Sequence, residues 1–196
     1  MKVEITHDIA CAWSALGYAR FRRAAAEHRA RGGDLEVAFR PYKSADCRAG
    51  APVSGAPRLA SAGQAERLVR AAAADGLDIR FDRIVPAATC GAHRLIAAAA
   101  EQGTAEDMAA RLYRAYFTDG LDIGDAGVLR GLASAAGVPW TGGEADERLG
   151  AGAARPGRAA GPRVPVFRFP DGTVLVGAVS LTMLQGELRR AVSVTA

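Results

Sequence analysis

Strand-like alternation occurs only near the two ends of this 196-residue chain. Residues 2–7 and 34–40 alternate apolar and polar side chains, and Pro41 stops the second run. Between them, residues 10–31 have the periodicity of an amphipathic helix that ends at two glycines. This order predicts a β-α-β unit with parallel strands and a right-handed crossover.

The middle of the chain has a helical pattern. Thr104 and Asp125 are the expected N-caps of two of its helices. Two stretches rich in proline or glycine, 41–63 and 142–160, lack periodicity and predict a loop and a poor helix at best. The apolar periodicity and the glycines that follow it predict four helices, over residues 63–75, 86–102, 104–117 and 125–136.

Strand character returns over residues 164–169 and 173–176, and the Asp-Gly pair between them is typical of a hairpin. A helix over about residues 181–192 follows. The full order predicts an α/β protein, a thioredoxin fold with a helical insertion. We expect three parts: the first half of the core with its loop, the insertion and the second half of the core, over residues 1–62, 63–160 and 161–196.

Composition limits the function classes. The chain is 49% hydrophobic and 23% charged, as in soluble globular domains. Its alanine-rich runs are broken by charged residues, so we expect no membrane span. No signal-peptide pattern precedes the first strand, which favours the cytoplasm. The net charge of +4 comes from scattered rather than clustered arginines, which speaks against nucleic-acid binding.

Cys11 lies between the first strand and the first helix. At a helix N-terminus, unpaired backbone N–H groups and the helix dipole are expected to stabilise its thiolate. Ser14 can donate a hydrogen bond to the Cys11 sulfur, or it is an ordinary first-turn residue. A serine cannot resolve a mixed disulfide, which needs a second sulfur. Trp13 could form an apolar wall for a substrate or pack on a neighbouring loop.

Two further cysteines, Cys47 and Cys90, make an odd total of three without metal-ligand spacing, so neither a disulfide framework nor a zinc site is predicted. Cys90 could supply the missing resolving sulfur or be a small buried apolar residue. The three histidines share no ligand spacing, and we expect no metal. His7 could shuttle protons for Cys11 or lie at the surface. His93, on a predicted insertion helix, could contact substrate or simply pack.

Val164 and Pro165 form the start of the third strand. A cis peptide bond between them is expected to turn the Val164 backbone toward Cys11 and offer a strand edge to substrate. The alternative is a trans proline at the start of an edge strand.

Three segments resemble the cytoplasmic DsbA-like proteins of polyketide gene clusters, which are related to 2-hydroxychromene-2-carboxylate isomerases and kappa-class glutathione transferases. Residues 8–14 resemble that family's Asp-x-x-Cys-Pro-Trp-Cys, and residues 164–167 resemble its Val-Pro-Phe-Phe segment with a cis-proline. Residues 92–95 and 112–125 look like its insertion helices. The resemblance implies the thioredoxin fold with a DsbA-type helical insertion.

This chain departs from the family's pattern at the site. Ser14 stands in place of the second cysteine, and Ala12 in place of the proline. Ala88 replaces an asparagine that lies near the active site of the isomerase and transferase relatives. The resemblance alone implies glutathione use, but Ala88 speaks against it, and we predict no cofactor.

Three functions stay open at this point. The first is a cysteine-dependent cis-trans isomerase of a polyenoyl, polyketide-type substrate, either free or bound to a carrier protein. The second is a monothiol thiol–disulfide oxidoreductase that needs an external thiol. The third is a binding module that holds its partner along the edge at Val164 and Pro165. Neither nucleic acid nor a membrane is an expected partner, and a homodimer stays open.

Overall fold

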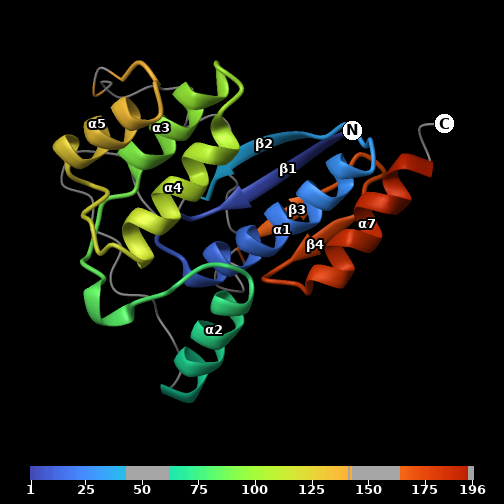
Figure 1. Cartoon of the computed structure of the whole chain (residues 1–196), viewed down its shortest axis with the longest axis horizontal. Coiled ribbons are helices and arrows are strands. Elements are labelled where there is room, and N and C mark those ends of the chain that lie inside the picture. Colours follow the sequence, from blue (N-terminus) through green and yellow to red (C-terminus); the bar gives the residue numbers. More distant parts are fainter. Residues whose placement is uncertain (43–61, 141, 143–163, 194–196) are drawn as a thin grey trace, which may run out of the picture.

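The computed structural model describes residues 1–42, 62–140, 142 and 164–193 (Figure 1). Its sheet has four strands in the order β2-β1-β3-β4. Strand β1 (Lys2–His7) pairs in parallel with β2 (Glu36–Pro41), as the β-α-β pattern predicts. Strands β3 (Val166–Arg168) and β4 (Val174–Val176) form the predicted hairpin, and β3 pairs antiparallel with β1. The two ends of the chain therefore share one sheet.

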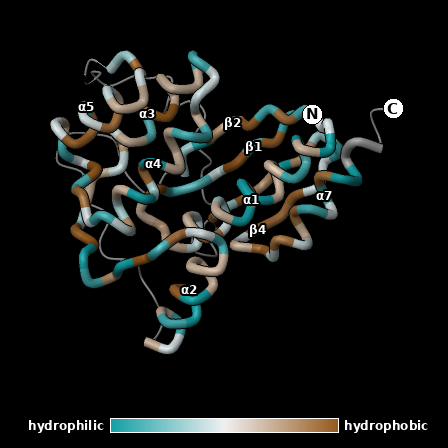
Figure 2. Tube along the Cα trace, in the orientation of Figure 1, coloured by the Kyte–Doolittle hydropathy of each residue, from teal (hydrophilic) through white to brown (hydrophobic). Residues whose placement is uncertain are grey.

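Helices α1 (Ala12–Ala30) and α7 (Leu181–Ser193) lie side by side (Figure 1). Phe21 of α1 stacks on Phe167 of β3, with ring centroids 5.5 Å apart. Both rings are fully buried, so this contact fixes α1 on the sheet. Figure 2 shows hydrophobic positions recurring along the strands and alternating with polar ones along the helices.

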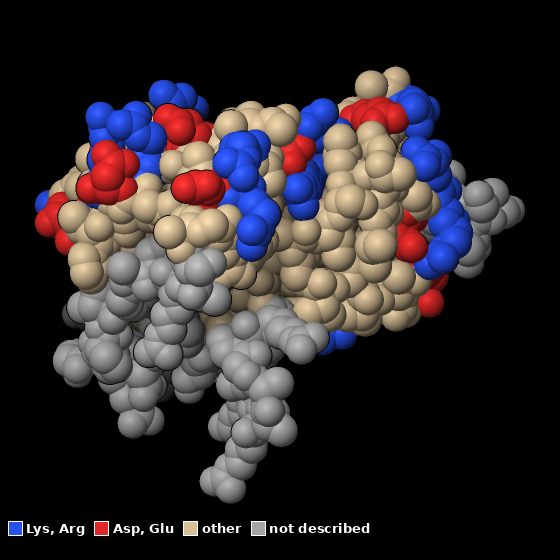
Figure 3. All heavy atoms as spheres, turned by 90° about the horizontal axis from the view of Figure 1, so that it is seen from below, with Lys and Arg blue, Asp and Glu red and all other residues tan. Residues whose placement is uncertain are grey.

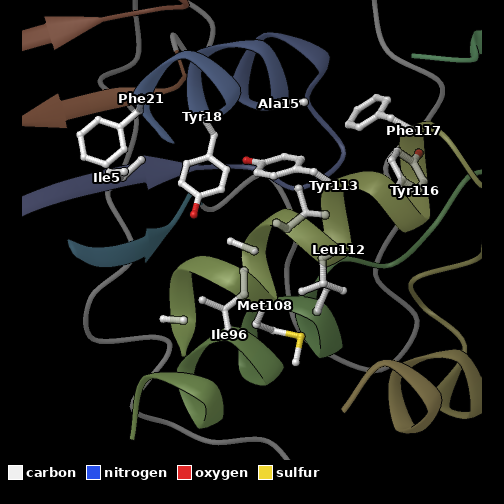
Figure 4. Packing of buried hydrophobic residues seen from close by; sticks show 14 of the residues in the cluster. Ile5, Ala15, Tyr18, Phe21, Ile96, Met108, Leu112, Tyr113, Tyr116 and Phe117 are labelled. Atoms are coloured by element: carbon white, nitrogen blue, oxygen red, sulfur yellow. The ribbon is translucent and has the colours of Figure 1, made fainter. Parts of the chain in front are cut away.

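Among the residues that the structure describes, four helices and a short 3₁₀ turn lie between β2 and β3 in the chain. Helices α3, α4 and α5 form a group at one side of the sheet, and α2 stands apart from them (Figure 1). Buried side chains from α3 and α4 meet those of α1 and β1 in one hydrophobic core (Figure 4). The elements are α2 (Ala62–Ala74), the turn Phe81–Arg83, α3 (Cys90–Ala100), α4 (Ala105–Phe117) and α5 (Ala126–Ala135).

The helix starts and caps agree with those predicted from the sequence, except at Thr104 and at the start of α3. Asp125 caps α5 as predicted, because its carboxylate accepts a hydrogen bond from the Val128 N–H at 2.8 Å. Thr104 stands at the N-cap position of α4, but its hydroxyl donates instead to the Ala99 carbonyl at 3.2 Å. Helix α3 begins at Cys90, four residues later than predicted, since residues 86–89 form an irregular segment after Val85.

The surface carries mixed charge. On the face in Figure 3, Lys and Arg stand beside Asp and Glu rather than in one field. Within the residues that the structure describes, no helix is both long and apolar enough to span a bilayer. The predicted irregular stretches at 41–63 and 142–160, and with them Cys47, lie almost wholly outside the described residues.

Candidate functional site

A tight turn places Cys11 at the start of α1. The Cys11 N–H donates to the Asp8 carbonyl oxygen at 3.1 Å, and the Ala10 N–H donates to the Asp8 carboxylate at 3.0 Å. The Cys11 carbonyl then accepts the first helical hydrogen bond, from the Ala15 N–H at 3.0 Å. Cys11 is thus the N-cap residue, and its side chain is partly exposed.

The protonation state of Cys11 differs from the expectation of a stabilised thiolate. Burial raises the pKa of the Cys11 thiol above its ordinary value, and the Asp8 carboxylate raises it further. Hydrogen bonds from Ser14 and from the Trp13 backbone act in the opposite direction but do not outweigh burial. The resting site therefore holds a protonated thiol, which must lose its proton before it can attack.

Ser14 lies beneath Cys11 and is fully buried. Its hydroxyl accepts a hydrogen bond from the Asp8 N–H at 3.3 Å, and its proximity lowers the pKa of the Cys11 thiol. Trp13, by contrast, is half-buried and packs against the core.

His7 and His93 come together although they are far apart in the sequence. Their ring centroids are 5.1 Å apart in an edge-to-face arrangement, and both side chains are buried rather than at the surface. Burial lowers the pKa of His7 well below its usual range and that of His93 to about 4, so both rings are neutral at pH 7. Neither Nε2 atom has a hydrogen-bond partner among the described residues.

Tyr113 of α4 forms a hydrogen bond with His7, and the sequence analysis missed it. Its hydroxyl oxygen lies 2.7 Å from Nδ1 of His7. Burial raises the pKa of Tyr113 well above its usual range, the Cys11 and Asp8 charges raise it further, and a hydrogen bond from Ser14 opposes them. In the sequence, Tyr113 is only one more apolar position of an amphipathic helix, so no local pattern marks it.

The Val164–Pro165 peptide bond is cis, as predicted. Pro165 lies against Gly17, one helical turn beyond Ser14 on the same face of α1. Both Val164 and Pro165 are buried, so only their backbone is suited to contact a substrate. The Pro165 carbonyl oxygen is already engaged by the Gly177 N–H at 2.7 Å.

Cys11 is a free thiol, whereas Cys90 is disulfide-bonded, which the odd cysteine count did not predict. Cys90 is therefore not bonded to Cys11. No group of three or more potential metal ligands occurs within the part of the chain that the structure describes.

Residues 2–189 match the DsbA-like thioredoxin domain. The chain belongs to this family. The match confirms the predicted thioredoxin fold with its helical insertion, whose element order the structure reproduces. The comparison with curated proteins found no match.

Several solved structures share the fold of this family member. A probable DsbA oxidoreductase from Streptomyces coelicolor is 28% identical, with a TM-score of 0.73 over 98% of this chain and 90% of its own. The cytosolic disulfide reductase DsbM from Pseudomonas aeruginosa is 21% identical, with a TM-score of 0.64 over 100% and 97%. A 2-hydroxychromene-2-carboxylate isomerase is 13% identical, with a TM-score of 0.63 over 100% and 98%.

Proposed function

We propose that this DsbA-like protein is an isomerase that uses Cys11 as a reversible nucleophile on a conjugated, electron-poor double bond. The observation that carries the proposal is Ser14, fully buried beside the partly exposed Cys11 at the position where a second cysteine would resolve a disulfide. A site with one partly exposed thiol can add to an electrophile and leave again, but it cannot close its own disulfide.

The proposed reaction has three steps. The Cys11 thiolate adds to the β-carbon of the conjugated system, and the π electrons move onto the carbonyl oxygen as an enolate. The former double bond, now single, rotates. The enolate then re-forms the double bond and expels the thiolate, which recovers its proton, so the reaction needs no oxidant, reductant or cofactor.

The substrate we propose is a polyenoyl, polyketide-type chain, free or bound to a carrier protein, in the cytoplasm. The roles we assign are nucleophile for Cys11, hydrogen-bond donor for Ser14 and proton shuttle for His7. Trp13, His93 and the backbone of Val164 and Pro165 would then line the substrate's path. The family resemblance to isomerases and to proteins of polyketide clusters supports this substrate class.

The test is turnover of a conjugated polyenoyl thioester without added thiol, followed by its change in retention and absorbance. Cys11→Ser should lower the rate by about a thousandfold or more, since it removes the nucleophile. Ser134→Ala, at an exposed position of α5 outside the site, is the control and should retain turnover. Unchanged turnover in a folded Cys11→Ser protein would contradict covalent catalysis.

A second candidate is a monothiol thiol–disulfide oxidoreductase, favoured by the 28% identity to a probable DsbA oxidoreductase. Such an enzyme would need an external thiol to release Cys11 from its mixed disulfide. Strict dependence on added glutathione, with reduction of a disulfide substrate and no isomerisation, would favour this candidate over the isomerase.

A further inference from the structure

Arg20 of α1 joins three parts of the chain beside the candidate site. Its Nε donates to the Asp75 carboxylate at 2.8 Å, and one terminal nitrogen donates to the carbonyl oxygens of Ala178 at 2.8 Å and Val179 at 3.2 Å. Asp75 follows α2, and the two carbonyl groups follow β4 (Figure 1). The side chain of Arg20 is only 19% exposed, and these partners on both sides fix the plane of its guanidinium.

The segment that Arg20 holds, residues 177–179, is a tight turn bonded to Pro165. The Val179 N–H donates to the Gly177 carbonyl at 2.8 Å, which closes a γ-turn, and the φ of Gly177 is +87°. The Gly177 N–H donates to the Pro165 carbonyl at 2.7 Å. A shift of the 177–179 turn would therefore be transmitted to Pro165.

Both Pro165 and this turn meet α1 at Gly17. A β-carbon at that position would lie 2.5 Å from the Pro165 Cγ and 3.4 Å from the Ala178 Cα. Ser14, Gly17 and Arg20 follow one another at intervals of three residues, so they lie along one side of the helix. The turn that Arg20 holds therefore borders the side of α1 on which the candidate site begins.

The surface at this turn is suited to an apolar chain. Ala178 and Val179 pack against the core but are only partly buried, so each side chain keeps some exposed surface. The neighbouring Pro165 and Val164 are apolar as well. Because Arg20 donates to the carbonyl oxygens of the turn, these oxygens keep a partner when a chain covers them.

We propose that Arg20 is a positioning residue of the candidate site. By holding the 177–179 turn against α1, it places the turn and Pro165 where the apolar chain of a substrate bound at Cys11 would lie. Arg20 acts through the turn and does not touch the substrate. This inference rests on the proposed function for the kind of substrate, and it deepens that proposal by assigning a surface to the chain.

Hydrogen exchange tests whether Arg20 holds the turn. Arg20→Lys keeps the positive charge beside Asp75, but an ammonium group lacks the planar fork that reaches the carboxylate and both carbonyls at once. Exchange of the peptide that contains residues 177–179, measured by mass spectrometry at pH 7, should become about tenfold faster. A peptide from α4 should exchange at the parent protein's rate, which distinguishes a loosened turn from a general loss of stability.

Arg23→Lys is the matched control. Arg23 lies on the same helix and donates to the same Asp75 carboxylate at 2.5 Å and to the Ala74 carbonyl at 3.1 Å. It makes no hydrogen bond to residues 177–179 in the part of the chain that the structure describes. Exchange of the turn in this variant should stay within about twofold of the parent rate. Equal exchange rates in the two variants would overturn the role of Arg20.

Labelling of Cys11 tests whether the turn positions an apolar chain. N-methylmaleimide and N-octylmaleimide carry the same electrophile and differ only in chain length, and mass spectrometry reads both on the Cys11 peptide. Arg20→Lys should lower the octyl rate about fivefold and keep the methyl rate within about twofold, because the chain loses its surface while the thiol is unchanged. An equal loss with both reagents, or no loss with either, would contradict a positioning role.

The two proposals can fail separately. Neither exchange nor labelling uses turnover, so a protein without isomerase activity can still show the Arg20 effect. If the protein isomerises a polyenoyl thioester, Arg20→Lys should raise KM about fivefold and keep kcat within about twofold, as expected when binding of the chain is lost. Normal turnover with an unchanged KM would remove Arg20 from substrate positioning and leave the isomerase standing.

Discussion

Pro165 lies so close to Gly17 of α1 that a β-carbon at Gly17 would come within 2.5 Å of the Pro165 Cγ. Real β-carbons essentially never approach a heavy atom that closely. The contact joins α1, which begins at Cys11, to the strand segment from the other end of the chain. Glycine at position 17 is therefore a packing requirement of the site.

Gly17→Ala should destabilise the protein by roughly 1–3 kcal/mol, because the Pro165 ring and its strand must shift. The matched control is Gly186→Ala in α7, where the added carbon meets nothing within 4 Å. That variant should gain up to about 1 kcal/mol from the higher helix propensity of alanine. Urea unfolding midpoints measure both. Equal stability of the two variants would show that the Pro165 segment can shift without lowering the free energy of unfolding.

Ser14→Cys should place a second sulfur beside Cys11. In air the variant should form an internal disulfide and lose isomerisation, and a reductant should restore it. Mass spectrometry after thiol labelling counts the free sulfurs. Ser14→Ala, which adds no sulfur, should keep Cys11 free under the same conditions. If the Ser14→Cys protein retains a free Cys11 in air, the side chains at positions 11 and 14 cannot adopt the geometry of a disulfide.

The buried histidines predict the pH dependence of stability. The pKa of His93 is about 4 in the folded protein against 6.5 when unperturbed, and that of His7 is lowered as well. The unfolded chain therefore binds more protons between pH 6.5 and pH 4. As the pH is lowered through this window, the free energy of unfolding should decrease by up to about 1.4 kcal/mol per pH unit for each histidine. Above pH 7 these two groups should not change the free energy of unfolding.

The measurement is urea unfolding of the parent protein and of His93→Gln at pH 4.5, 5.5 and 7.0. The variant should show a shallower decline, because one of the two groups that take up protons on unfolding is gone. An identical slope in the two proteins would contradict a buried neutral His93.

Asp75, just beyond α2, holds two arginines of α1. Its carboxylate pairs with Arg20 at 2.8 Å and with Arg23 at 2.5 Å, and its side chain is only 8% exposed. Asp75→Asn should cost about 1–3 kcal/mol, since it leaves a partly buried guanidinium poorly paired. Glu66→Gln is the control, because both side chains of its pair with Arg70 are 70% exposed. Its effect in thermal unfolding should stay below about 0.5 kcal/mol.

Most of the fold follows from local patterns in the sequence. Period-two alternation marks β1 and β2, and positive-φ glycines such as Gly103 and Gly137 end helices where the pattern stops. Asp125 caps α5 for the same local reason. The start of α3 was predicted too early because a proline is compatible with a first helical turn as well as with a loop.

The site was predictable only in part. Cys11 and Ser14 follow from their place between a strand and a helix. The contacts among His7, His93 and Tyr113 did not, since they join β1 to two insertion helices and depend on tertiary packing. The direction of the Cys11 pKa shift was also missed. A helix N-terminus is visible in the sequence, whereas the burial that outweighs it is not.

The pairing of β1 with β3 has a consequence for biosynthesis. The ribosome makes β1 and Cys11 more than 150 residues before Pro165. While the residues between them are made, β1 lacks one of its two neighbours, and α1 lacks the proline ring that rests on Gly17. Pairing across so long a separation in the chain forms late and slowly. The nascent protein therefore carries an unassembled candidate site until β3 and the Pro165 segment have been made.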